Sequence, residues 1–180
     1  RKPYVNRNLA AHQLELKLNN KLSVRLVELA IYGARSFDVH YSLPFIPFWS
    51  IQHYLGDTDN IIMLGEFKYK LKSSLAIYGA LLIDEWTPQL TFSKNENRNW
   101  FGYQIGFNYK KLFFQKDKLN VEYNWTDHRI YRHRYEINNF YSNIYPVGFW
   151  GGPHAEEFFI NYSFEKFNFE FDVEYSKSKR

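Results

Sequence analysis

Cationic and aromatic side chains alternate between residues 128 and 135, a combination suited to binding acidic sugars. An arginine can hold a carboxylate through two parallel hydrogen bonds, and an aromatic ring can pack on the apolar face of a sugar. One interpretation is a glycan-binding surface made by Arg129, Tyr131, Arg132, His133, Arg134 and Tyr135, with Trp150 as a further ring. The alternative is a solvated segment whose arginines pack on tyrosines or face lipid phosphates.

Two other groups of residues contain potential metal ligands. Asp57 and Asp59 offer closely spaced oxygen ligands, but the downstream glycine and bidentate glutamate of a calcium-binding EF-hand are missing. We expect both carboxylates to cap backbone amides in a turn instead. His128 and His133 lack the i, i+4 spacing of a zinc pair on a helix. The sequence predicts no metal and no cofactor.

The elements that carry these residues are expected to be strands with two different faces. The stretch from Phe101 to Lys110 alternates aromatic or aliphatic residues with small or polar ones, and residues 169–175 repeat the pattern with acids. Successive side chains of a strand point to opposite faces of its sheet. One face is therefore apolar and the other is polar.

Composition favours a membrane location for that apolar face. Aromatic residues make up 21% of the chain, and such rings concentrate at membrane interfaces. The mean hydropathy is −0.52, and no apolar run approaches the about 18 residues of a spanning helix. We therefore expect an all-β, antiparallel transmembrane β-barrel, and the alternative is a soluble β-sandwich with an aromatic core. The absence of cysteine agrees with an oxidising compartment, and a net charge of +4 does not suggest nucleic acid.

The chain, residues 1–180, reads as one segment of four hairpins. The expected strands cover residues 11–18, 22–32, 61–71, 75–85, 100–110, 119–126, 157–164 and 168–176. A loss of alternation near Leu26 predicts a β-bulge in the second strand. Short turns join the strands at one end, and long loops at residues 33–60, 86–99 and 127–156 join them at the other. This is the pattern of outer-membrane barrels, whose long loops are extracellular.

Eight strands can close a small barrel, but we expect a fragment of a larger one. The start at Arg1-Lys2-Pro3 has no apolar export signal, and the end at Ser176-Lys177-Ser178-Lys179-Arg180 has no terminal aromatic residue. We therefore expect a piece of a longer exported chain.

Charged residues in the strands are expected to face the interior of the barrel. These residues are Arg25, Glu28, Glu66, Lys68, Asp84 and Glu122. Paired acids can act as general acid and base in a glycosidase or lipase-like barrel. The more ordinary interpretation is salt bridges across the interior, and we expect Glu66 to lie near a cation of a neighbouring strand.

Motifs in the loops resemble a known family. In order they are Tyr32-Gly33-Ala34-Arg35, Pro44-Phe45-Ile46-Pro47-Phe48-Trp49, residues 52–60, residues 78–85, Glu122-Tyr123, Tyr131, His133, Tyr141, Pro146-Val147-Gly148 and residues 151–156. This series resembles the C-terminal part of the barrel in the Wzi family of outer-membrane capsule assembly proteins. The resemblance implies a barrel of roughly eighteen strands in a Gram-negative outer membrane.

The resemblance also implies a lectin-like role without catalysis, in which the protein helps attach capsular polysaccharide at the cell surface. The expected partners are that polysaccharide, outer-membrane lipid and lipopolysaccharide. A passive outer-membrane pore is the main alternative function, and an outer-membrane hydrolase is a less favoured one. We expect residues 127–156 to fold over the extracellular mouth.

Overall fold

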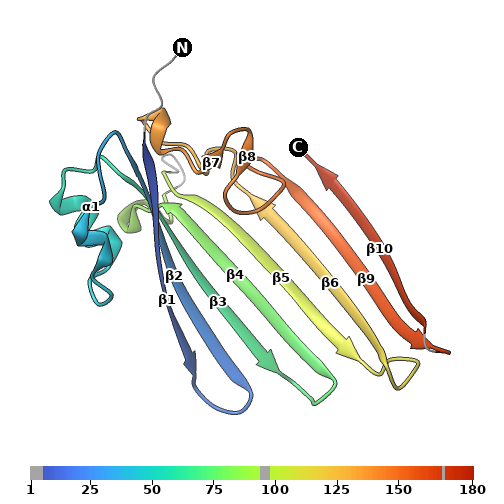
Figure 1. Ribbon diagram of the computed structural model, residues 1–180. Coiled ribbons are helices and arrows are strands. Elements are labelled where there is room, and N and C mark those ends of the chain that lie inside the picture. Colours follow the sequence, from blue (N-terminus) through green and yellow to red (C-terminus); the bar gives the residue numbers. More distant parts are fainter. Residues whose placement is uncertain (1–5, 94–97, 168) are drawn as a thin grey trace.

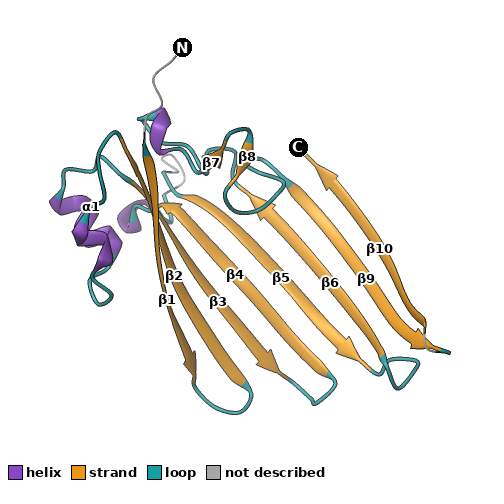
Figure 2. Ribbon diagram, viewed as in Figure 1, coloured by secondary structure: helices purple, strands orange, loops and turns teal. Residues whose placement is uncertain are grey.

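A computed structural model describes residues 6–93, 98–167 and 169–180, which form one antiparallel sheet of eight strands (Figures 1 and 2). The order is β1-β2-β3-β4-β5-β6-β9-β10, and among the described residues β1 and β10 are unpaired edges, so the sheet is open. The strands are β1 (Arg7–Lys17), β2 (Leu22–Gly33), β3 (Asn60–Lys70), β4 (Leu75–Glu85), β5 (Trp100–Lys110), β6 (Asp117–Thr126), β9 (Glu156–Lys166) and β10 (Phe169–Lys179).

The connecting segments hold the remaining short elements. These are the α-helix α1 (Phe48–Tyr54), the 3-10 helices η1 (Val39–Ser42), η2 (Pro88–Leu90) and η3 (Glu136–Asn138), and the small strands β7 (Tyr141–Ser142) and β8 (Tyr145–Pro146). Over the described part of the chain, no helix has the length and apolar character needed to cross a membrane.

The predicted arrangement of eight antiparallel strands is confirmed. Short turns lie at one end of the sheet, called here the turn end, and the long segments lie at the other, called the loop end (Figure 1). Three predictions extend outside the described residues: the starting residue Asn168 of the last strand, residues 94–97 of one long loop, and the interpretation of Arg1-Lys2-Pro3.

The two faces of the sheet differ as the alternation predicts. Ile105 of β5 lies opposite Gly79 of β4 and opposite Tyr123 of β6, so these three residues share one face. On this apolar face, large side chains of successive strands are exposed. Its members include Leu26 at 50% exposure, Phe67 at 41%, Leu81 at 42%, Ile105 at 59% and Val173 at 62%. The opposite, polar face carries the charged and amide side chains.

One prediction about β2 is wrong. Its pairing with β1 and with β3 is continuous through Leu26 and Val27, so no bulge is present there. Because the alternation is unbroken, Arg25 lies on the polar face and Glu28 on the apolar face. The irregularity is instead in β4, between Ile83 and Glu85, where the pairing with β5 shifts.

Two segments cover opposite faces of the sheet at its loop end. Residues 34–59, which include α1, pack on the apolar face and bury Ala30, Tyr32, Tyr41, Phe48, Ile51 and Ile61 in one cluster. Residues 127–155 pack on the polar face and bury Ile31, Ile62, Ile130, Tyr131 and Phe140 in another. The largest buried clusters therefore lie at the loop end, while much of the rest of each face stays open.

Candidate functional site

Tyr131 belongs to the buried cluster on the polar face and is not a surface residue. Its side chain has 0% exposure, and its hydroxyl accepts a hydrogen bond from the N–H of Phe149 at 3.0 Å. Its own N–H donates to the Asp84 carboxylate. Burial raises the pKa of the Tyr131 phenol. The prediction that Tyr131 contacts a glycan is therefore wrong, because this ring anchors its segment to the sheet.

Arg129 is held by contacts within the protein. Its Nε and Nη2 atoms each donate to a carboxylate oxygen of Asp127 at 2.8 Å, and Nη2 also donates to the Asn99 carbonyl at 3.0 Å. The hydrogen bonds to Asp127 raise the pKa of the guanidinium. The guanidinium carbon also lies 5.7 Å from the centre of the Trp100 ring, within the range of a cation–π contact. Arg129 therefore fixes the start of the segment against β5.

Arg134 joins the two long segments. Its Nη2 donates to the carbonyls of Gly56 at 3.3 Å and Asp57 at 2.5 Å. The guanidinium lies 5.0 Å from the centre of the half-exposed Tyr135 ring. Arg134 is exposed but occupied, so its principal role is to hold residues 56 and 57.

His133 and Trp150, also predicted to bind glycan, lie apart from each other. The backbone N–H of His133 donates to Asn139 Oδ1 at 2.6 Å, and burial lowers the pKa of the imidazole. Trp150 donates through Nε1 to Glu157 at 3.1 Å and lines a different hollow. The predicted set is therefore not one surface.

A pocket of about 660 Å³ at the loop end brings part of the predicted set together with residues from three other segments. Three of the five tryptophans line it: Trp49 from α1, Trp86 just after β4, and Trp100 at the start of β5. Arg132, His133 and Arg134 form another part of its wall, and His53 lies on α1. We call this the Trp–Arg pocket. Its acidic lining residues are Glu28, Asp57, Asp84 and Glu85.

Arg132 differs from the other arginines of its segment. It is exposed, and within the described ranges it makes no hydrogen bond or ion pair. Trp49 and Trp86 are also half-exposed, at 51% and 49%. The Trp49 ring packs at 4.4 Å between centroids on His53, whose Nδ1 is 2.9 Å from the Trp49 carbonyl oxygen. The pocket thus combines aromatic faces held in place with a cation that has no internal partner.

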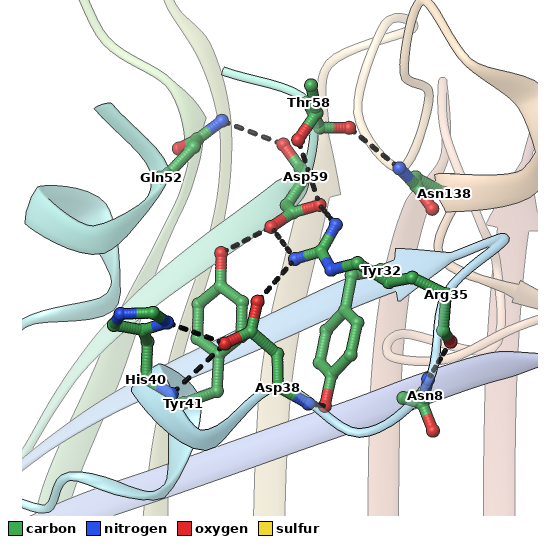
Figure 3. Close-up of polar contacts among 10 residues, drawn as sticks. All are labelled: Asn8, Tyr32, Arg35, Asp38, His40, Tyr41, Gln52, Thr58, Asp59 and Asn138. Atoms are coloured by element: carbon green, nitrogen blue, oxygen red, sulfur yellow. Dashed lines mark hydrogen bonds and ion pairs between the residues drawn. The ribbon is translucent and has the colours of Figure 1, made fainter. Parts of the chain in front are cut away.

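An ion pair between the partly exposed Arg35 and the buried Asp59 supports the wall that carries α1 (Figure 3). Asp59 has 0% exposure, and its two oxygens accept from Nη1 and Nη2 of Arg35 at 2.6 Å each. The Tyr41 hydroxyl donates to the same carboxylate at 2.6 Å, and the Gln52 amide donates to the Asp59 carbonyl at 2.8 Å. Hydrogen bonding to Asp59 raises the pKa of Arg35.

This geometry replaces the predicted role of the two aspartates. Asp59 is the centre of an ion pair and does not cap a turn, while Asp57 is exposed with a positive φ of 56°. No group of three or more potential ligands for a metal ion occurs among the described residues.

Two asparagines connect the covering segments to each other. The Asn60 amide donates to the Asn138 carbonyl at 3.0 Å, and the Asn138 amide donates to the Thr58 carbonyl at 2.8 Å. Together with the Arg134 contacts, these bonds fix the 132–134 segment relative to the loop after α1.

The charges expected inside a barrel divide between three environments. Glu66 accepts from Arg25 Nε at 2.6 Å, which confirms the predicted cross-strand partner, and Lys68 is exposed beside them on the polar face. Glu122, on the same face, accepts from the Tyr78 hydroxyl at 2.6 Å and from Gln104 at 3.0 Å. Asp84 is buried under Tyr131.

Glu28 is the exception among these charges. It lies on the apolar face and contacts His12 Nε2 at 2.6 Å. It also accepts from the N–H of Phe48 at 2.8 Å. Its role is to dock α1, and it does not belong to the polar face.

Comparison with protein-family models, with curated proteins and with solved structures found no match. The resemblance to the Wzi family therefore rests on the sequence motifs. The two-faced sheet and the Trp–Arg pocket are the structural features that bear on function.

Proposed function

We propose that this chain forms part of the wall of a Wzi-like outer-membrane β-barrel. In this arrangement the apolar face contacts lipid, the polar face lines the interior, and the loop end is extracellular. The exposed apolar side chains that follow one another across the sheet support the proposal. The strands have 10 to 12 residues, in keeping with the about 9–11 that a tilted strand needs to cross a bilayer.

The same barrel would attach acidic surface polysaccharide through the Trp–Arg pocket without catalysing a reaction. The observation that carries this proposal is the unpaired Arg132 beside the half-exposed rings of Trp49 and Trp86. A guanidinium recognises a carboxylate through a planar pair of hydrogen bonds, and tryptophan offers a large apolar surface for a sugar ring.

The packing of residues 127–155 favours attachment over free passage through a pore. Ile130, Tyr131 and Phe140 are each 0% exposed on the polar face. If that face lines the interior, this segment fills it at the loop end.

The orientation of the sheet can be tested by cysteine scanning along β5 in a cysteine-free background, since residues 1–180 contain no cysteine. Single cysteines would replace Tyr103, Gln104, Ile105 and Asn108 in the full-length protein in isolated outer membranes. We expect a water-soluble maleimide to modify positions 104 and 108 and to spare positions 103 and 105. Uniform modification, or the reverse alternation, would contradict the proposed orientation.

The attachment site can be tested with Arg132→Ala in cells that make capsule. We expect more capsule in the medium and less on the cells, with the barrel still assembled. Arg132→Lys should restore part of the attachment, because it keeps the charge but loses the planar donor pair. Lys72→Ala removes the same charge at the turn end and serves as the control. Normal capsule retention by assembled Arg132→Ala would rule out this pocket as the attachment site.

Arg129 and Arg134 are unsuitable for this test. Their guanidinium groups hold Asp127 and the carbonyls of residues 56 and 57. Replacing them would move the pocket walls as well as remove charge.

A further inference from the structure

Lysines gather on the polar face at the turn end, far from the Trp–Arg pocket. This group, called here the lysine face, consists of Lys17, Lys21, Lys68, Lys70, Lys110 and Lys118. All six side chains are exposed, and within the part of the chain that the structure describes none forms an ion pair. Four of them, from β1, the first turn and β3, surround a hollow of about 510 Å³ whose described lining includes no acid.

The pairing of the strands places like charges directly opposite each other twice. Lys110 of β5 is the partner of Lys118 of β6. The N–H of Lys70 donates to the Lys21 carbonyl at 2.8 Å, which extends the β2–β3 register by one pair and sets these lysines opposite each other. Like charges in directly opposed positions destabilise a sheet.

In the next row of the same face, opposite charges face each other. Glu15 of β1 lies opposite Arg25 of β2, and Arg25 lies opposite Glu66 of β3. Opposite charges alternate there, and Nε of Arg25 reaches Glu66 at 2.6 Å. The same strands therefore pair opposite charges in one row and leave only positive charge in the rows nearest the turns.

Most acids near the lysine face bond to other groups; the exception is Glu15, which lines a neighbouring hollow together with Lys68 and Lys118. Asp117 accepts from the N–H groups of Leu112, Phe113 and Phe114 and from the Tyr162 hydroxyl. Glu165 pairs with Lys116 at 2.7 Å, and Glu122 is occupied by Tyr78 and Gln104.

We propose that the lysine face is a second binding site, which takes an acidic polysaccharide chain at the turn end of the sheet. Two groups of unpaired cations, four around the first turn and β3 and two on β5 and β6, fit a linear polyanion that crosses β4 between them. Its successive acidic groups would relieve the repulsion between opposed lysines. The choice of polysaccharide among polyanions rests on the proposed function, whereas the preference for a polyanion follows from the charges alone. A barrel would then contact acidic glycan both inside its turn end and at its loop end.

The decisive variant is Lys21→Glu in the full-length protein in detergent micelles. The introduced carboxylate faces Lys70, so we expect the urea midpoint of unfolding to rise while affinity for oligogalacturonate falls on the order of tenfold at low salt. Lys179→Glu makes the same change of net charge at the loop end of the sheet, where β10 ends. Because this position lies farther from the lysine face than the screening length, the affinity should change by less than about twofold. Titration calorimetry measures both affinities.

The outcomes separate the alternatives. Tight binding of oligogalacturonate but not of neutral dextran, lost in Lys21→Glu only, supports the site. Equal losses in Lys21→Glu and Lys179→Glu would show a non-specific effect of net charge and would overturn it. Tighter binding of poly-glutamate than of oligogalacturonate would overturn the assignment to a polysaccharide. All of these variants are compared in the Arg132→Ala background, so the Trp–Arg pocket does not contribute to the measured binding and the lysine face can fail while the proposed function stands.

Discussion

Two adjacent residues of β5 provide a stringent test of which face of the sheet meets lipid. Ile105 lies in the middle of the strand on the apolar face with 59% of its surface exposed. Gln104 lies on the polar face, where its amide donates to Glu122 at 3.0 Å. Ile105→Arg and Gln104→Arg place the same charge one residue apart, on opposite faces.

The expected difference in stability is large enough to measure. An arginine on the lipid side at the bilayer midplane costs about 2–4 kcal/mol. The arginine at position 104 would lie beside a carboxylate, where an exposed pair contributes about 0–1 kcal/mol. We therefore expect Ile105→Arg to be less stable than Gln104→Arg by roughly 2–4 kcal/mol.

The assay is urea unfolding of the full-length protein from lipid vesicles, with stability taken from the midpoint and slope of each transition. Ile105→Ala corrects for the loss of apolar side-chain surface. If Ile105→Arg proves as stable as Gln104→Arg, the apolar face does not contact lipid. A sheet whose apolar face meets water would give that result.

Two predictions concern the segment that covers the polar face. Tyr131→Phe should lower the free energy of unfolding by about 1–3 kcal/mol, because the N–H of Phe149 loses its acceptor; an unchanged urea midpoint would contradict the anchoring role. Burial holds the pKa of His133 below its unfolded value of about 6.5, so the unfolded state binds more protons and stability falls as the pH drops below that value. His133→Asn should reduce this slope between about pH 7 and 5, and an identical slope in the variant would show that His133 does not cause it.

The alternation in the sequence was sufficient to predict the strands and most of their faces. It works because the side-chain period of a strand is two, so Phe101, Tyr103 and Ile105 fall on one side once the strand is identified. It failed for Glu28, since an apolar run through Leu26 and Val27 was interpreted as a bulge. Sequence alone did not show that α1 would cover part of the apolar face and bind the Glu28 carboxylate there through a backbone N–H.

The candidate site was harder to predict because its walls come from segments far apart in the chain. Arg132 was identified from its local pattern, but Trp49, Trp86 and Trp100 are brought to it only by the packing of the two covering segments. Pro47 directly before an aromatic pair was an available signal for α1, since proline favours the start of a helix. Nothing in the local pattern distinguished the buried Tyr131 from the exposed Tyr135.

Glu28 also sets a limit to the part of the apolar face that lipid could reach. An uncovered carboxylate on that face would be costly in a bilayer, yet Phe48 stacks on its partner His12 at 4.0 Å and donates its N–H to Glu28 at 2.8 Å. Toward the turn end from Glu28, Leu26 is 50% exposed; toward the loop end, Ala30 is fully buried under the covering segment. The boundary of the lipid-contacting band should therefore lie between Leu26 and Glu28, with α1 and the Trp–Arg pocket on the aqueous side of it.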